Sequence, residues 1–312
     1  LERTSSLEKD DLLLALLSGG GSSLLSLAAP GVAMADLKSI TQLLLRSGAA
    51  IQEMNTVRKH LSAIHGGRLA AASRAPVLAL IISDVTGDDP THIASGPCAP
   101  DPTTCEDATA ILSRYGIPVP DRLSESPKPG DPAFTRVENR VVATAHRSLE
   151  AAAEVFRAKG VRPAILGDTV TGEASEVAKV MAALVREVRK YGEPFQAPVA
   201  LISGGETTVT VRGEGGRGGR CGEFLLSLAI ELEGVEEVWA IAADTDGIDG
   251  SEDNAGAVFT PDSSPGARAR GLEAKAFLAR NDSYGFFAAL GELVVTGPTR
   301  TNVNDYRAIV LA

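Results

Sequence analysis

Runs of apolar residues without polar alternation recur along the chain and predict strands that are buried on both faces. Four such runs are Leu12–Leu17, Val77–Ile82, Val199–Ile202 and Val238–Ala243. Between them, apolar residues at helical spacing predict helices, for example over residues 51–64 and 173–189. Unbroken strands that alternate with helices are typical of parallel sheets. The pattern therefore predicts an α/β fold.

Two other patterns divide the chain. Residues 118–136 hold five prolines among charges and serines, which is typical of a surface connection between domains. A second βαβ pattern starts after it, with a strand at Val141–Ala145. We therefore expect one domain over residues 1–133 and another over residues 134–312. Thr207–Val211 alternates apolar and polar residues and predicts a half-exposed antiparallel strand.

A glycine-rich turn follows the first apolar run. It consists of Ser18, Gly19, Gly20, Gly21 and Ser22 and leads into a predicted helix. Because glycine has no Cβ, backbone N–H groups can converge there on a bound anion. The carboxyl end of a parallel sheet is also where α/β proteins bind ligands. The alternative is a tight turn whose glycines serve packing alone.

Carboxylates follow two of the predicted buried strands. Asp84 stands directly after Val77–Ile82, where a Mg²⁺ ligand or an acceptor for a hydroxyl proton would be placed. For residues 87–90, which include Asp88 and Asp89, turn chemistry alone is an equally good explanation. Asp244 and Asp246 follow Val238–Ala243 and form a second cluster of carboxylates.

Arginines lie in a second glycine-rich stretch, residues 213–220. Arg217 and Arg220 point to a phosphate or carboxylate ligand, because guanidinium groups bind such oxyanions through paired hydrogen bonds. The glycines at 213, 215 and 218 also match GxGxxG. This keeps a nicotinamide cofactor open, although an alternating strand precedes the match. Arg58, in a short basic run on a predicted helix, could bind a carboxylate or simply face solvent.

The composition narrows the choice of partners. The 312 residues include 40 acidic and 30 basic ones, for a formal net charge of −10, which argues against nucleic acid or an anionic membrane as a main partner. No apolar run approaches the roughly 20 residues of a membrane span. Three cysteines without a CxxC pair favour a reducing, cytoplasmic setting. Cys98 and Cys105 could bind a metal only with help from distant residues.

Four segments together resemble a known family. They are NTVRKHLSAIHGGRLA at 55–70, SDVTGDD…IASGP at 83–97, the GGRGGR stretch, and TGPTRTNVND at 296–305. They are similar to class II glycerate kinase, the glycerate 2-kinase family with a C-terminal MOFRL domain. The resemblance implies a Rossmann-like first domain with a mainly parallel sheet and a mixed-sheet MOFRL-type second domain. It also implies phosphorylation of the 2-hydroxyl of D-glycerate to 2-phosphoglycerate with ATP and Mg²⁺.

With that activity in view, we assign roles to the candidate residues. We expect Arg217, Arg220 and Asp84 to be catalytic, and Ser18 to Ser22, Asn55 and Arg58 to bind glycerate. Nucleotide contacts are expected from Gly204, Gly205, Glu206, Thr299, Asn302 and Asp305, and metal ligands from Asp84, Asp244 and Asp246. The expected partners are glycerate and the nucleotide, and the protein could be a homodimer.

The sequence departs from the family pattern in a few places. The family carries a Gly-Lys-Ala segment near its amino end, whose lysine is thought to be catalytic. The 312 residues of this sequence contain no such segment. We therefore expect the natural protein to extend further at that end. Arg300 stands where a glycine is usual. Two rival functions stay open: an NAD(P)-dependent hydroxypyruvate reductase, and a non-catalytic module that binds a carboxylate or nucleotide.

Overall fold

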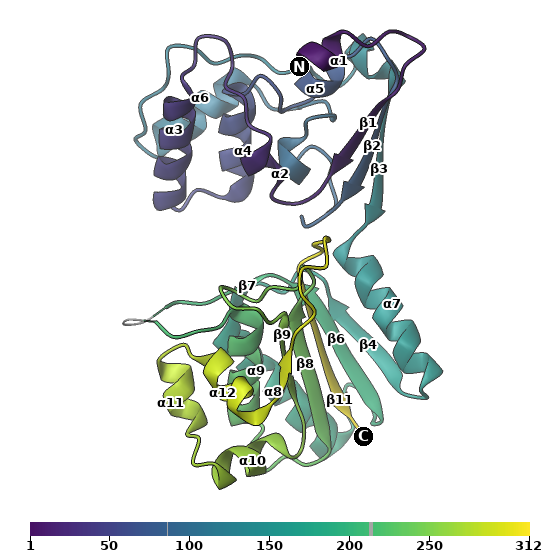
Figure 1. The fold of residues 1–312 in the computed structure, drawn as a ribbon, viewed down its shortest axis with the longest axis vertical. Helices are drawn as coiled ribbons and strands as arrows, with labels where there is room; N and C mark the ends of the chain where they lie inside the picture. Colours follow the sequence, from purple (N-terminus) through teal and green to yellow (C-terminus); the bar gives the residue numbers. More distant parts are fainter. Residues whose placement is uncertain (86, 212–214) are drawn as a thin grey trace. The chain divides into compact units, whose positions relative to one another are not determined.

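The computed structural model describes residues 1–85, 87–211 and 215–312, and the chain divides into two compact units (Figure 1). The first unit covers Leu1–Ala143 and the second Thr144–Ala312. The division falls later than the expected boundary at residue 133, because the strand over Val137–Ala143 pairs with a strand of the first unit. This strand was expected in the second domain.

The first unit is built on a parallel sheet of three strands in the order β1-β2-β3. The strands are β1 (Leu13–Leu17), β2 (Val77–Ile82) and β3 (Val137–Ala143). The helices around them are α1 (Glu2–Ser5), α2 (Gly21–Leu24), α3 (Met34–Arg46), α4 (Ile51–His60), α5 (Arg68–Ala71) and α6 (Cys105–Arg114), with 3-10 turns η1 (Ile93–Ser95) and η2 (Pro132–Arg136). The expectation of a parallel sheet is confirmed.

Helices cover one face of this sheet (Figure 1). Ala15, Ala79 and Ile81 lie on the covered face and are buried. On the other face of β1, Leu14 and Leu16 are 50% and 72% exposed. The prediction that this first strand is buried on both faces is therefore wrong for the residues described. An apolar run indicates that a strand tends to be buried, but it does not show which element would cover each face.

The proline-rich segment is not a connection between the units. It packs on the first unit: Ser124 N–H donates to the carbonyl of His60 at 2.9 Å, and Arg68 donates to the Ser124 carbonyl at 2.6 Å. Asp101 N–H donates to the Pro127 carbonyl at 3.0 Å. Prolines remove donors from this segment, but its carbonyls still accept, so the segment is held in place by the helices beside it.

The second unit contains a mixed six-stranded sheet in the order β10-β9-β8-β11-β6-β4, as expected. Its strands are β4 (Arg162–Gly167), β6 (Val199–Gly205), β8 (Val238–Asp244), β9 (Gly256–Phe259), β10 (Leu293–Val294) and β11 (Asp305–Leu311). The helices are α7 (Ala145–Ala158), α8 (Ala174–Tyr191), α9 (Arg220–Glu231), α10 (Ser263–Ala269), α11 (Ala274–Ala279) and α12 (Ser283–Leu290). Its largest core lies between α8, α9 and the sheet, with Phe224, Leu228 and Leu201 at its centre.

The expected antiparallel strand at 207–211 is much shorter in the structure. Only β7 (Thr207–Thr208) forms, and it pairs in parallel with β5 (Gly172–Glu173). Of the GxGxxG match, Gly213 lies outside the described residues. A Cβ built on Gly218 would overlap the Ser283 hydroxyl, so this glycine has a packing reason to be there.

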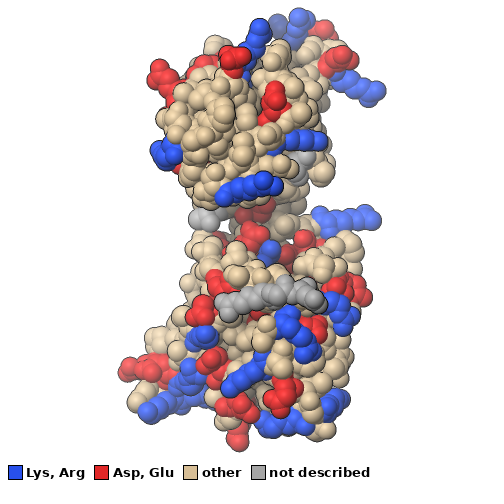
Figure 2. Space-filling view, turned by 90° about the vertical axis from the view of Figure 1, so that its left-hand side faces the viewer, with Lys and Arg blue, Asp and Glu red and all other residues tan. Residues whose placement is uncertain are grey.

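Figure 2 shows basic and acidic side chains interspersed over the face in view. Within the described part of the chain, no helix has both the length and the apolar character needed to cross a bilayer.

Candidate functional site

In the first unit, the glycine-rich turn lies against Asp84. A Cβ built on Gly19 would overlap the Asp84 carboxylate, so the absence of a side chain at this position lets the two approach. Gly20 has φ 71° and caps α2, which starts at Gly21. Because β1 and β2 are adjacent and parallel, their carboxyl ends bring the turn and the carboxylate to one edge of the sheet.

A second chain of contacts leads from this turn to α4. Gly21 lies beside Ala94, and the buried Ser95 hydroxyl donates to Asn55 Oδ1 at 3.1 Å. Ala94 and Ser95 have φ 50° and 58°, a left-handed conformation that strains residues with a Cβ. Sequence reasoning predicted a role for Asn55 but missed Ser95, since nothing in the sequence signals a strained serine.

Arg58 lies on the same helix as Asn55, in a partly buried position where desolvation lowers the pKa of its guanidinium. Among the residues that the structure describes, it has no carboxylate partner. The pKa of the neighbouring His65 is lowered to about 4, first by burial and then by nearby cations that include Arg58. At neutral pH His65 is thus uncharged, and Arg58 is left as a positive charge that an anion can balance.

In the second unit, Arg220 is the centre of a group of carboxylates. It lies at the first residue of α9, and its Nε donates to Asp305 Oδ1 at 2.7 Å. One terminal nitrogen donates to Asp244 Oδ2 at 2.7 Å, and the other lies 3.1 Å from Glu206 Oε1. The guanidinium fork thus bridges three acids from three segments.

The sheet explains why these acids meet. Asp305, the first residue of β11, is paired with Asp244 on β8 and with Gly205 on β6. Arg307, two residues along β11 and buried, binds the other oxygen of Asp305 and donates to the Gly204 carbonyl at 3.2 Å. Strand register therefore sets the geometry. Sequence reasoning missed Arg307, which looks like an ordinary residue of a closing strand.

Burial changes the proton affinity of several acids here. It raises the pKa of Asp244 to about 7 and that of Asp249 to about 6, although Asp249 accepts N–H bonds from Cys221 and Gly222 at 2.9 and 2.7 Å. Glu223 on α9 has its pKa raised by burial to about 7. For Arg220, burial acts to lower the pKa, but Asp305 and the other acids outweigh it and raise the pKa.

Arg217 occupies a different environment from Arg220. It is exposed, and its guanidinium lies 4.9 Å from the centre of the Tyr284 ring. Its backbone carbonyl accepts from Tyr284 N–H at 3.0 Å. The structure therefore separates the two arginines that the sequence placed in one loop: Arg220 is bound by acids, and Arg217 stacks on an aromatic ring.

The loop after β8 and the segment before β11 are joined by hydrogen bonds. Thr299 N–H donates to the Asp246 carbonyl at 2.9 Å, and its hydroxyl donates to the Thr245 carbonyl at 2.6 Å. Asn302 Oδ1 accepts from the N–H of Asn304 at 2.9 Å. Arg300 has φ 62°, a conformation that favours glycine. This agrees with the glycine that is usual at this position in the family that the sequence resembles.

Comparison with known proteins gives a consistent picture. Two family models match: "Domain of unknown function (DUF4147)" over residues 1–126 and "MOFRL family" over residues 199–305. A protein of Agrobacterium vitis with the provisional name hydroxypyruvate reductase is 53% identical, covering 97% of this chain and 70% of that protein. The D-glycerate 2-kinase of Thermotoga maritima is 42% identical over 98% of this chain and 73% of its own length.

The fold agrees with the sequence comparison. The crystal structure of glycerate kinase from Thermotoga maritima superimposes with a TM-score of 0.90 at 39% identity, covering 100% of this chain and 75% of that one. Sequence and fold similarity thus extend over both units and identify the same relatives. The chain belongs to the glycerate kinase family.

Proposed function

We propose that this protein transfers the γ-phosphoryl group of ATP to the 2-hydroxyl of D-glycerate and forms 2-phosphoglycerate. The observation that carries the proposal is the similarity of the whole chain, in sequence and fold, to a D-glycerate 2-kinase. The site supports it, because phosphoryl transfer requires mainly positioning and charge stabilisation. Both are available in the two clusters described above.

The first unit would bind glycerate. The backbone N–H groups of the Ser18–Ser22 turn would hold an anionic group, and Arg58 would pair with the glycerate carboxylate. Asn55 would be oriented for binding by its contact with Ser95. Asp84, held beside Gly19, would accept the proton of the 2-hydroxyl.

The second unit would bind the nucleotide. The proposed contacts are Gly204, Gly205, Glu206, Thr299, Asn302 and Asp305, which lie around the ends of β6 and β11. Arg217, which is exposed, would bind phosphate oxygens. Arg220 would hold the acids in place and supply positive charge to the transferring group.

The acids of this cluster fit a Mg²⁺ ion in their chemistry. Mg²⁺ prefers oxygen ligands and usually takes one or two carboxylates together with substrate phosphates. Burial raises the pKa of Asp244 to about 7, and a nearby cation would stabilise its ionised form. Asp246, two residues further along the chain, is the second proposed ligand. In the first unit, Asp84 is proposed separately as a Mg²⁺ ligand. When bound, the ion would neutralise charge on the phosphate oxygens.

The experiment uses the natural protein, its mass verified intact. It is incubated with ATP, Mg²⁺ and D-glycerate, and in a second assay with NADH or NADPH and hydroxypyruvate. We expect ADP and phosphoglycerate in the first assay and unchanged cofactor absorbance in the second. Oxidation of the cofactor without phosphoryl transfer would support the reductase; a thermal shift with ligand but no turnover in either assay would support a binding module. A cytoplasmic location and a homodimer stay predictions.

A further inference from the structure

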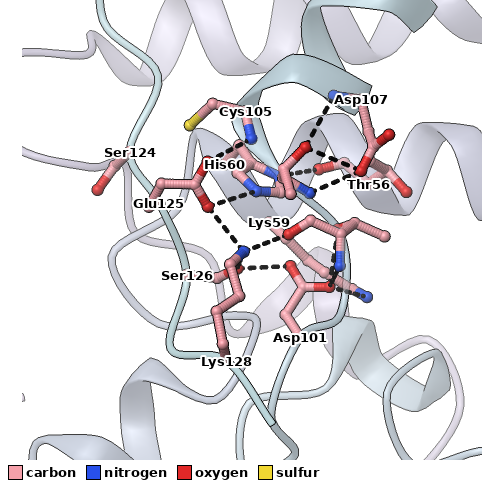
Figure 3. Close-up of polar contacts among 12 residues, drawn as sticks. Thr56, Lys59, His60, Asp101, Cys105, Asp107, Ser124, Glu125, Ser126 and Lys128 are labelled. Atoms are coloured by element: carbon pink, nitrogen blue, oxygen red, sulfur yellow. Dashed lines mark hydrogen bonds and ion pairs between the residues drawn. The ribbon is translucent and has the colours of Figure 1, made fainter. Parts of the chain in front are cut away.

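Three side chains from separate segments of the first unit converge outside the residues assigned to phosphoryl transfer. His60 is the last residue of α4, Cys105 is the first residue of α6, and Glu125 lies in the proline-rich segment. His60 offers a ring nitrogen, Cys105 its sulfur and Glu125 a carboxylate oxygen, and these atoms lie within 4.8 Å of one another. Figure 3 shows the Glu125 carboxylate beside both other residues.

His60 supplies the observation that points to a ligand. Its side chain is fully buried, and Nδ1 lies 2.8 Å from the Thr56 carbonyl. Because a carbonyl can only accept, Nδ1 carries the hydrogen, and in the neutral ring Nε2 carries a lone pair. Among the described residues Nε2 has no hydrogen-bond partner, and it lies 3.8 Å from Glu125 Oε2. In that tautomer the buried lone pair faces a carboxylate, and a cation held between the two would satisfy both.

The backbone contact of Nδ1 also fixes the ring in the orientation that metal-binding histidines adopt, with the second nitrogen held by a carbonyl. We propose that His60 Nε2, the Cys105 thiolate and the Glu125 carboxylate bind one zinc-class divalent ion, with water in the fourth position. Nitrogen and thiolate donors favour Zn²⁺ over Mg²⁺, so this site is chemically distinct from the proposed nucleotide site.

The geometry requires only small movements. Ligand atoms around one tetrahedral Zn²⁺ lie about 3.3–3.8 Å apart, so no separation here would have to shorten by more than about 1.5 Å. Glu125 is half exposed and Cys105 partly exposed, which gives the ion a route from solvent. Without metal the thiol is protonated, since burial and hydrogen bonding to Glu125 raise the pKa of Cys105 to about 11. Binding would release that proton to solvent.

Lys128 competes with the ion for the carboxylate. Its ammonium lies 2.7 Å from Glu125 Oε2 and would be repelled by a divalent cation. It has other partners, because it also donates to the Ser126 hydroxyl at 3.0 Å and to the Thr103 carbonyl. Removing its charge should therefore strengthen metal binding. A bound ion would tie the end of α4 and the start of α6 to the proline-rich segment.

The test is a titration of chelator-treated protein with Zn²⁺ against a chromophoric chelator, together with absorption spectra of the Co²⁺ form. We expect one equivalent of metal per chain, a thiolate-to-cobalt charge-transfer band and a melting temperature higher by a few degrees. Cys105→Ser should remove the band and weaken binding by at least about 100-fold. Glu125→Gln, which keeps an acceptor for the Cys105 N–H, should weaken it by at least about 10-fold.

Two further variants separate a built site from general surface binding. His146→Gln removes an exposed histidine of the second unit and should leave affinity and spectrum unchanged. Lys128→Gln should tighten binding by about 10-fold. Metal affinity that is the same in Cys105→Ser as in the natural protein, or a Co²⁺ spectrum without the charge-transfer band, would overturn the proposal. These readouts do not depend on kinase activity, so they stand whether or not the proposed function holds.

Discussion

Arg220 Nε and Asp305 Oδ1 are 2.7 Å apart and join the start of α9 to the start of β11. Asp305 is almost completely buried, and its second oxygen is bound by Arg307. The same arginine reaches Asp244 on the neighbouring strand. Arg220 thus neutralises two buried carboxylates at one edge of the sheet, and a side chain that looked like a free phosphate ligand in the sequence also has a structural role.

Arg220→Ala should lower kcat by about 10³, by analogy with arginines that stabilise the transferring phosphoryl group. It should also destabilise the second unit by about 3 kcal/mol, because the buried Asp244 loses its counter-charge while Asp305 keeps only Arg307. The measurements are steady-state kinetics below the melting transition and thermal unfolding. Arg268→Ala, which removes an exposed ion pair with Glu233, is the matched control. A folded Arg220→Ala variant with natural kcat would remove Arg220 from the mechanism.

Gly19→Ala should lower kcat/KM by about 10² or more, since the added Cβ overlaps the Asp84 carboxylate and must displace it or the turn. Asp84→Asn should reduce the rate and change its Mg²⁺ dependence. Gly266→Ala in α10 is the control, because its Cβ would lie 3.3 Å from the flexible end of Arg270, which can move, and 3.7 Å from Leu290. If both Gly19→Ala and Asp84→Asn kept the natural activity, Gly19 and Asp84 would have no role beyond forming the turn.

Arg58→Gln should raise the KM for glycerate by about 10- to 100-fold while kcat changes much less. The substrate carboxylate keeps its charge throughout the reaction, so an arginine that pairs with it contributes equally to ground and transition states. Substrate-dependence curves at saturating ATP give both constants. Arg74→Gln, at an exposed position of the same unit, should leave them unchanged. An unaltered KM in Arg58→Gln would assign Arg58 to the solvated basic face.

Glu223→Gln should flatten the dependence of stability on pH. Burial raises the pKa of Glu223 in the folded state to about 7, above its ordinary value of 4.5. The folded protein then holds this proton more tightly than the unfolded chain, so the stabilisation is complete below about pH 4.5 and is lost as pH rises through about 7. The difference is on the order of 3 kcal/mol.

Denaturant unfolding between pH 4 and 8 measures this effect. The glutamine keeps the acceptor for Asn281 Nδ2, which Glu223 Oε1 binds at 3.0 Å, but cannot titrate. Glu154→Gln, at an exposed position of α7, is the comparison. An identical dependence of the unfolding free energy on pH in the natural protein and Glu223→Gln would show that folding does not change the pKa of Glu223.

The sequence predicted the positions of strands better than the packing and pairing around them. Unbroken apolar runs identified β2, β6 and β8 as strands, but of these three only β6 is buried along its whole length, and Trp239 of β8 is 40% exposed. The strand at Val137–Ala143 was placed in the wrong domain, since Glu138 and Arg140 interrupt its apolar pattern and hide its pairing with β2. The prolines at 118–136 led to the prediction of a linker. That prediction was wrong, because composition does not show which carbonyls accept hydrogen bonds.

The candidate site was predicted in its residue types and not in its contacts. Asp244 and Asp305 were singled out separately, but they are 24 and 85 residues from Arg220, and only strand register brings the three together. Likewise, Cys105 needed distant partners to bind a metal, and the fold places His60 and Glu125 beside it. Long-range pairing of this kind leaves no local signal in a single sequence.

The most direct test of the central claim is a phosphorus–proton correlation NMR spectrum of the product formed from ATP and D-glycerate by the natural protein. The account predicts a phosphate signal coupled to the single proton on C2, which identifies 2-phosphoglycerate. A phosphate coupled to the two protons on C3, or no new phosphate ester while hydroxypyruvate is reduced by NADH or NADPH, would contradict it.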